Sequence, residues 1–242
     1  MLLSDKTAVI YGGGGSIGGA IAKAFQREGA EVFLAGRTKA TLDAVGEGDH
    51  TYEVDALDEA SVGDFVAKVL ARTGRLDITC NVIGVGDVQK PLTELSVDEF
   101  LQPISIAMRS HFLTVRAAVP YMISQRSGVI LAFGGNGPQT LPGLGGFKIA
   151  LDAVEGLRRQ WAVELGQYNI RVVTLRTGGI AESMPEDMPG RDEIAAGFVD
   201  AALLPHTATL ADVGNVAAFV CSDLARTITD TEINISCGAI VD

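Results

Sequence analysis

The chain has 242 residues, 47% of them hydrophobic and 20% charged, and a formal net charge of −11 at pH 7. This hydrophobic fraction excludes an intrinsically disordered chain, and the negative charge disfavours binding to nucleic-acid phosphates or anionic lipid surfaces. Nucleic acids and membranes are therefore not expected partners, although a local arginine and backbone N–H groups can still hold an isolated anion.

The first residues run directly into a strand pattern and lack the long apolar stretch of a signal peptide. No run approaches the roughly 18 apolar residues of a membrane span. The three cysteines, Cys80, Cys221 and Cys237, lie far apart in apolar segments. We expect reduced thiols in the core of a cytoplasmic protein.

Short apolar runs alternate with longer helical patterns along the chain. Strands are predicted at Thr7–Gly12, Glu31–Gly36, Thr51–Val54, Asp77–Ile83, Gly128–Gly134, Ile170–Arg176 and Glu232–Ser236. Helices are predicted at Ile17–Glu28, Asp58–Thr73, Val97–Gln125, Phe147–Tyr168 and Ala211–Ser222. This alternation predicts an α/β fold with a doubly wound, parallel, seven-stranded sheet, and the nearly unbroken apolar strands require helices on both faces. Because no repeat or linker interrupts the pattern, we expect residues 1–242 to form one domain.

Residues 181–210 break this alternation and contain three prolines, Pro185, Pro189 and Pro205. The segment lies between a predicted strand and a predicted helix, at the carboxyl edge where α/β sheets bind ligands. We expect a substrate lid with a short helix near Arg191–Leu203, and the alternative is a surface excursion without a role.

A glycine-rich loop follows the first predicted strand and opens the first predicted helix. Its Gly13, Gly15 and Gly18 match the G-x-G-x-x-G pattern. Glycines let the backbone approach a pyrophosphate and place the free amides of a helix N-terminus against it. The strand–turn–helix context favours nucleotide binding over a simple tight turn.

The second predicted strand ends at Arg37, which lies 19 residues after Gly18. An acidic residue near this position binds the ribose 2′-hydroxyl in NAD sites, whereas a guanidinium favours a 2′-phosphate through its charge and bidentate geometry. The sequence therefore favours NADP(H) over NAD(H). A solvated arginine, with weak or no cofactor binding, is the alternative.

The chain resembles the short-chain dehydrogenase/reductase family over essentially its whole length. The segment Tyr11–Gly18 is similar to the family's T-G-x-x-x-G-I-G loop, Asn81–Gly84 to its N-N-A-G motif, and Arg176–Ile180 to the P-G stretch beside the nicotinamide, with Thr177 in place of proline. The resemblance implies a Rossmann fold. It also implies cofactor contacts at Gly12, Gly14, Gly15, Ser16, Ile17, Gly18, Arg37, Asp55, Asn81, Gly84, Thr177, Gly178 and Ile180.

The catalytic positions of this family are altered. Family members use a tyrosine as general acid or base, a lysine that lowers its pKa, a serine that binds the substrate oxygen and an asparagine that supports a proton-relay water. The corresponding positions here are Phe147, Leu151, Gly135 and Ala107. None has a hydrogen-bonding side chain, and losing a general acid alone costs about 10²–10⁴ in rate. The sequence predicts a degenerate catalytic site.

Few residues are available as substitutes. Arg176 ends a strand at the ligand edge, and we expect it to line a substrate pocket together with Asn136 and Phe147. His111 lies one turn beyond Ala107, but a lone histidine there is more often structural. Lys148 is turned about 100° from Phe147 around its helix, so we expect it to face solvent or another subunit. No cluster has metal-ligand spacing, so no metal site is expected.

Three functions remain open from the residues and the resemblance. The first is an NADP(H)-dependent oxidoreductase of an unidentified carbonyl or alcohol substrate, with a non-standard proton donor. The second is a non-catalytic binding or partner subunit, and the third is a non-redox lyase or cyclase. The helices Val97–Gln125 and Phe147–Tyr168 resemble the pair that joins subunits in this family, so we expect a homodimer or homotetramer.

Overall fold

A seven-stranded parallel sheet forms the centre of the computed structural model, which describes residues 1–46, 50–135 and 140–241. Its strands are β1 (Thr7–Tyr11), β2 (Glu31–Gly36), β3 (Thr51–Glu53), β4 (Ile78–Asn81), β5 (Gly128–Gly135), β6 (Ile170–Thr177) and β7 (Thr231–Asn234). The order is β3-β2-β1-β4-β5-β6-β7, and every neighbouring pair is parallel. The chain therefore switches direction across the sheet between β1 and β4, which is where doubly wound sheets bind ligands. The predicted fold class is confirmed.

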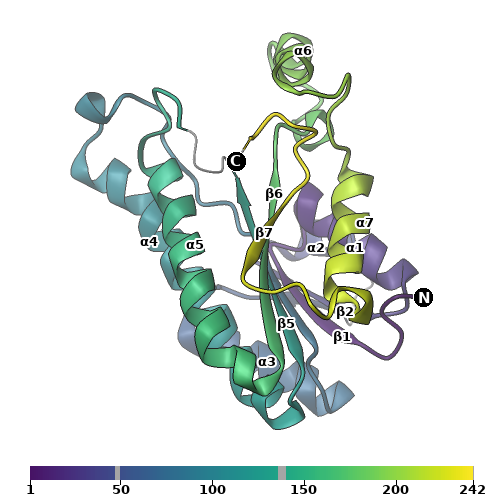
Figure 1. Cartoon of the computed structure of the whole chain (residues 1–242). Helices are drawn as coiled ribbons and strands as arrows, with labels where there is room; N and C mark the ends of the chain where they lie inside the picture. Colours follow the sequence, from purple (N-terminus) through teal and green to yellow (C-terminus); the bar gives the residue numbers. More distant parts are fainter. Residues whose placement is uncertain (47–49, 136–139, 242) are drawn as a thin grey trace.

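Helices cover both faces of this sheet (Figure 1). The helices are α1 (Ser16–Arg27), α2 (Lys39–Asp43), α3 (Glu59–Thr73), α4 (Val97–Gln125), α5 (Gly145–Leu165), α6 (Arg191–Ala201) and α7 (Leu210–Cys221), with short 3₁₀ helices at Leu92–Glu94, Gly166–Tyr168, Ala181–Ser183 and Asp223–Ala225. Helices α4 and α5 lie on one side of the sheet and α1 and α7 on the other. Among the described residues, none of the helices combines the length and apolar character that a membrane span requires.

Local capping explains where helix α4 begins. The Ser96 side chain accepts a hydrogen bond from the backbone N–H of Glu99, and the Glu99 carboxylate accepts one from the N–H of Ser96. This capping box starts α4 at the predicted residue. Helix α5 differs from its prediction because it starts two residues earlier and its last turn, Gly166–Tyr168, is a 3₁₀ helix. Helix α2 was not predicted, since its five residues are too few to show a period.

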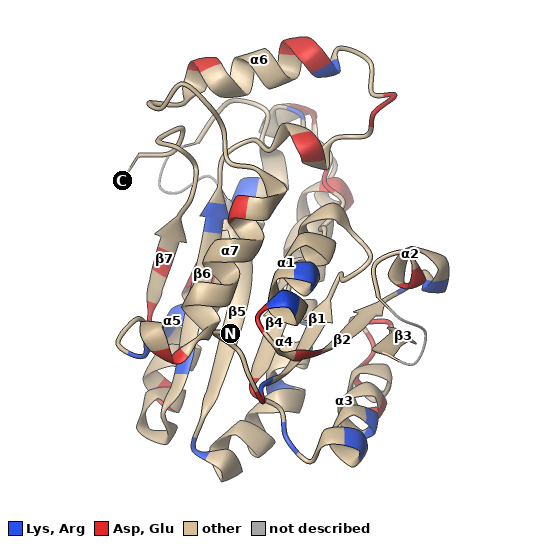
Figure 2. Cartoon of the chain, turned by 90° about the vertical axis from the view of Figure 1, so that its right-hand side faces the viewer, with Lys and Arg blue, Asp and Glu red and all other residues tan. Residues whose placement is uncertain are grey.

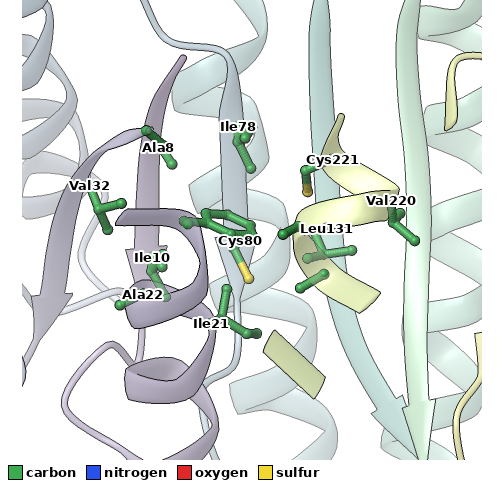
Figure 3. Close-up of a cluster of buried hydrophobic side chains, with 14 of the residues drawn as sticks. Ala8, Ile10, Ile21, Ala22, Val32, Ile78, Cys80, Leu131, Val220 and Cys221 are labelled. Carbon is green, nitrogen blue, oxygen red and sulfur yellow. The ribbon is translucent and has the colours of Figure 1, made fainter. Parts of the chain in front are cut away.

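The core on the α1 and α7 side contains two of the three cysteines (Figure 3). Cys80 on β4 and Cys221 at the end of α7 are buried among aliphatic side chains of the sheet and both helices. Burial raises the pKa of both thiols, to about 12 for Cys221. The predicted core position is confirmed for these two cysteines, whereas Cys237 is partly exposed.

Helix α6 lies beyond the carboxyl ends of the strands, separate from the two helix layers (Figure 2). It buries none of its residues. The chain after it is tied to the C-terminal segment, because the N–H groups of Leu203 and Leu204 donate to the carbonyl oxygen of Cys237 at 3.0 and 3.1 Å. The Phe198 ring packs so closely on Gly179 that a Cβ there would lie 2.3 Å from it. The predicted short helix is confirmed, and its function as a lid stays a prediction.

Candidate functional site: a cleft at the switch point of the sheet

A cleft of about 540 Å³ opens at the carboxyl ends of β1 to β4, where the strand order reverses. It is lined by Tyr11, Gly12, Gly14, Gly15, Ala35, Gly36, Arg37, Thr38, Thr41, Leu42, Val54, Asp55, Ala56, Leu57, Val82, Ile83, Gly84, Val85, Gly86, Gln102 and Ile106. Six of the predicted cofactor residues are in this lining: Gly12, Gly14, Gly15, Arg37, Asp55 and Gly84. Clefts at this position of a parallel sheet are typical nucleotide sites.

The glycine-rich loop forms one wall of the cleft, and each glycine has a separate structural reason. Gly12 has a φ of 82°, which disfavours other residues. A Cβ on Gly18 would lie 2.4 Å from the carbonyl oxygen of Gly12, so glycine alone fits there. Gly15 is exposed to the cleft, and a Cβ there would meet only the Gly12 oxygen at 3.4 Å.

Helix α1 directs its N-terminus at this wall. It begins at Ser16 with Gly15 as its N-cap, so no side chain caps the N–H groups of its first turn, Ser16, Ile17 and Gly18. Uncapped amides at the positive end of a helix dipole are suited to a pyrophosphate. The glycine cradle and these amides fit the phosphates of a dinucleotide.

Arg37 stands at the end of β2 with its guanidinium exposed at the rim of the cleft. Within the described residues, its side chain makes no hydrogen bond or ion pair. The neighbouring cation, Lys39, is instead held by Asp43 at 2.5 Å and by Thr51 at 2.8 Å. Asp55 lies across the cleft after β3, and its Oδ1 accepts a hydrogen bond from the N–H of Leu57 at 2.9 Å. Arg37 is therefore the cation of this rim that remains available to an anionic ligand.

Asn81 does not line the cleft but holds the loop that does. It is buried at the end of β4, where its Oδ1 accepts from the N–H of Ile83 at 3.1 Å and its Nδ2 donates to Thr114 on α4 at 3.3 Å. These bonds hold the loop that carries Gly84 into the lining.

The remaining predicted cofactor residues lie further along the sheet edge. Thr177 is at the end of β6, paired with Gly135 of β5. Gly178 follows it against Ala239, and Ile180 is buried in the core on the α1 side. None of these residues lines the cleft.

Single side chains from other elements complete the lining and were not predicted from the sequence. These are chiefly Thr38 and Thr41 beside α2, Leu57 after β3, and Gln102 and Ile106 on α4. No motif marks them, because their exposure to the cleft depends on how α4 and the loops after β2 and β3 pack together. The helical period places Gln102 and Ile106 on one face of α4, which is the only signal that the sequence contains.

Two of the four altered catalytic positions, Ala107 and Phe147, pack together in apolar surroundings. Ala107 of α4 belongs to a buried cluster with Val85, Ala132, Ala150 and Val154, and the Phe147 ring packs against this cluster. Leu151 lies one turn after Phe147 on α5, and Gly135 ends β5. Asn136, the other predicted pocket residue, lies outside the described residues.

Arg176 is tied into the protein interior. Only 3% of its surface is exposed, and its Nη1 donates to Glu232 of the neighbouring strand β7 at 2.9 Å. Burial and the adjacent Glu155 carboxyl raise the pKa of Glu232, and the two arginines, Arg176 and Arg158, oppose this rise. Arg176 does not line the cleft.

The other two substitute candidates are also buried. Lys148 is only 6% exposed and pairs with Asp152, so the prediction that it faces solvent is wrong. The Nδ1 of His111 lies 2.9 Å from the carbonyl oxygen of Ala107, so this nitrogen carries the proton of the neutral ring, since a carbonyl only accepts. Burial lowers the pKa of His111 from 6.5 to about 4. At neutral pH this histidine is uncharged.

The buried His111 predicts a pH dependence of stability. The pKa is lower in the folded state, so the unfolded chain binds the proton more readily between pH 6.5 and about 4. Stability is therefore fully present above pH 6.5 and falls as the pH drops, by about 3 kcal/mol in total. Urea unfolding at pH 7 and pH 4.5 should show a loss about 2 kcal/mol larger for the natural chain than for His111→Gln. Equal losses in the two proteins would contradict this assignment.

The parallel sheet, the glycine cradle at its switch point and the uncapped N-terminus of α1 together define a Rossmann fold, the class of fold that holds dinucleotides at this position. The chain belongs to the short-chain dehydrogenase/reductase family, a family of oxidoreductases: the family model described as enoyl-(acyl carrier protein) reductase matches residues 13–239. Homologues in this family depend on nicotinamide dinucleotides and are commonly oligomeric.

Individual relatives agree with this assignment over the full length. Levodione reductase of Leifsonia aquatica is 30% identical over 253 residues, covering 97% of this chain and 94% of that protein. The 3-oxoacyl-(acyl-carrier-protein) reductase of Thermotoga maritima is 28% identical over 250 residues, with 100% of both chains covered. The crystal structure of levodione reductase superposes with a TM-score of 0.87 at 28% identity, covering 98% of each chain. A dehydrogenase/reductase structure from Mycobacterium ulcerans has a TM-score of 0.89 at 23% identity and supports the fold alone.

Proposed function

We propose that this chain is an NADP(H)-binding member of its family that does not transfer hydride by the family's tyrosine route. The observation that carries the proposal is the contrast between the two parts of the site. The nucleotide cleft keeps its glycine cradle and Arg37, while the positions for proton transfer carry Ala107, Phe147 and Leu151. When bound, NADP(H) would bring a hydride donor or acceptor, and these three side chains would supply no acid.

Preference for the 2′-phosphorylated cofactor rests on Arg37. Its guanidinium is exposed at the cleft and has no acidic partner among the described residues. A planar guanidinium forms charge-assisted, bidentate hydrogen bonds with a phosphate. With an unphosphorylated ribose at this position, the N–H groups of Arg37 would hydrogen-bond only to water.

The burial of Arg176 and His111, the two candidate replacements for the family's catalytic residues, supports a binding role over catalysis. Arg176 is engaged by Glu232, and His111 is neutral and bonded to the backbone of Ala107. Neither residue lines the cleft. An arginine also cannot act as a general acid at neutral pH.

An oxidoreductase with a non-standard proton donor is the second candidate. The observation in its favour is that the relatives are named as reductases and oxidoreductases. A water molecule or a group on the substrate would then donate the proton. A lyase or cyclase in the same pocket has no specific observation in its favour.

Cofactor titration combined with a carbonyl panel separates these functions. We expect NADPH to bind with micromolar affinity, NADH to bind more weakly, and no carbonyl substrate to be reduced. The matched comparison is a variant that restores the family's side chains, Ala107→Asn, Gly135→Ser, Phe147→Tyr and Leu151→Lys. We expect this variant to gain reductase activity, because a general acid contributes about 10²–10⁴ in rate.

Two results would contradict the proposal. Carbonyl reduction by the natural chain at rates comparable to the restored variant would favour the second candidate. Absence of nucleotide binding at millimolar concentrations would remove the cofactor assignment altogether.

The same proposal includes a cytoplasmic location and a homodimer or homotetramer. Cys80 and Cys221 are free thiols, which suits a reducing compartment. On the outer surface of α4 and α5, Phe112 is 41% exposed and its ring stacks on that of Trp161, with 6.0 Å between the ring centroids. The guanidinium of Arg116 lies over the Phe112 ring. Exposed aromatic rings next to arginine are enriched at subunit interfaces.

A further inference from the structure

The cleft occupies only one half of the ligand edge of the sheet. Its lining comes from β1 to β4, the loops after them, and α4. Among the described residues, none from β5, β6, β7 or α5 takes part in it. A dinucleotide lies across the switch point of such a sheet, with one nucleotide on each side. The cleft therefore lies on the side of the sheet that carries the glycine-rich loop, Arg37 and Asp55, and this is the side that would hold the adenosine half of a dinucleotide.

On α5, the positions that correspond to the family's tyrosine and lysine carry the apolar side chains of Phe147 and Leu151. Phe147 packs on the buried cluster around Ala107 and Ala132, and Leu151 follows it by one helical turn. A sugar hydroxyl placed against these side chains loses its hydrogen bonds to water and gains none from the protein. A nicotinamide ribose placed beside them would therefore receive no polar contact from these two side chains.

The charged group at the end of β6 is directed away from this side as well. Arg176 donates to Glu232, which is hydrogen-bonded to Glu155, and Glu155 in turn accepts from Arg158 at 2.7 Å. Arg158 also pairs with Asp230. These ion pairs join α5, β6 and β7, and the Nη1 of the buried Arg176 is engaged by the Glu232 carboxylate.

We infer that the ligand group recognised by this protein is the 2′-phosphorylated adenosine diphosphate moiety, and that the nicotinamide riboside half contributes little to affinity. The inference rests on the proposed NADP(H) cleft and narrows its ligand class. Compounds that carry a 2′-phospho-ADP group bind whether or not they carry a nicotinamide. The residues described above fit the first half of the cofactor and do not fit the second.

Calorimetric titration of the full chain tests this inference with three probes: NADPH, 2′-phospho-ADP-ribose and 2′-phospho-ADP. We expect NADPH to bind less than about tenfold more tightly than either nicotinamide-free compound. A larger advantage of NADPH would overturn the inference and leave the proposed NADP(H) binding intact. Failure of all three compounds to bind would overturn the proposed function together with the inference.

A single added lysine gives a second, independent measurement. Leu151→Lys places an ammonium where it can donate to the hydroxyls of the second ribose, so it should raise the NADPH advantage over 2′-phospho-ADP by about tenfold. The matched control is Ile149→Lys, which adds the same charge two residues away at a site that is 43% exposed. We expect this control to leave the ratio unchanged. If Leu151→Lys leaves the ratio of the NADPH and 2′-phospho-ADP affinities unchanged, or tightens both compounds equally, the nicotinamide riboside half does not lie beside Leu151 and the inference is overturned.

Discussion

Arg37→Glu is expected to weaken NADPH binding by about 100-fold, which corresponds to about 2–3 kcal/mol, while the affinity for NADH changes by less than about threefold. The guanidinium of Arg37 is exposed at the rim of the cleft and makes no ion pair within the described residues. Replacing it removes a bidentate phosphate contact and adds a repelling carboxylate. Fluorescence titration with both cofactors measures the difference.

The matched control for this charge reversal is Arg226→Glu. Arg226 is also exposed, but it borders a separate small pocket with Lys6 and Asp77, at the amino ends of β1 and β4. The two variants have the same net charge, so a general electrostatic effect would weaken NADPH binding in both. Equal losses for NADPH and NADH in Arg37→Glu would exclude the 2′-phosphate contact.

Gly15→Asp is expected to abolish nucleotide binding, with a loss of at least about 100-fold, while the protein stays folded. Gly15 has a φ of −83° and a ψ of 167°, which any residue can adopt, and a Cβ there meets only one atom, at 3.4 Å. An aspartate at the N-cap of α1 would accept hydrogen bonds from the amides that otherwise face the phosphates. Its charge would also repel the pyrophosphate.

Two further variants separate charge, capping and packing at this loop. Gly15→Ser caps the helix without a charge, so we expect a smaller loss of affinity, about tenfold. Gly18→Ala should unfold at a lower temperature, because its Cβ would lie 2.4 Å from the carbonyl oxygen of Gly12. Thermal unfolding and NADPH titration of each variant provide the two readouts. NADPH binding by Gly15→Asp at the affinity of the natural chain would place the phosphates elsewhere.

Local sequence rules predicted much of the fold. The alternation of apolar strands with helices indicated the parallel sheet, and the structure confirms its seven parallel strands. Helix α4 begins and ends as predicted, because a capping box at Ser96 starts it and Arg126 stops it in a left-handed conformation. These signals act within a few residues along the chain, so they can be read without knowledge of the tertiary structure.

The glycine-rich loop and Arg37 were also predictable, since a motif next to a strand end is carried to the ligand edge by the sheet itself. Residues whose exposure depends on distant neighbours were not. Lys148 was expected to face solvent or another subunit, yet packing buries it. Arg176 was expected in a substrate pocket, but the structure pairs it with Glu232, 56 residues later in the chain.

The sequence by itself determined the seven strands and the longer helices, the capping box that starts α4, and which glycines allow close approach to phosphate. Only the tertiary structure decided which side chains converge on the cleft and which charges are buried. The physical reason is that helix capping and glycine conformation are local properties of the chain. Burial of a charge and its pairing instead depend on segments that come together only when the sheet and its helices pack into the folded structure.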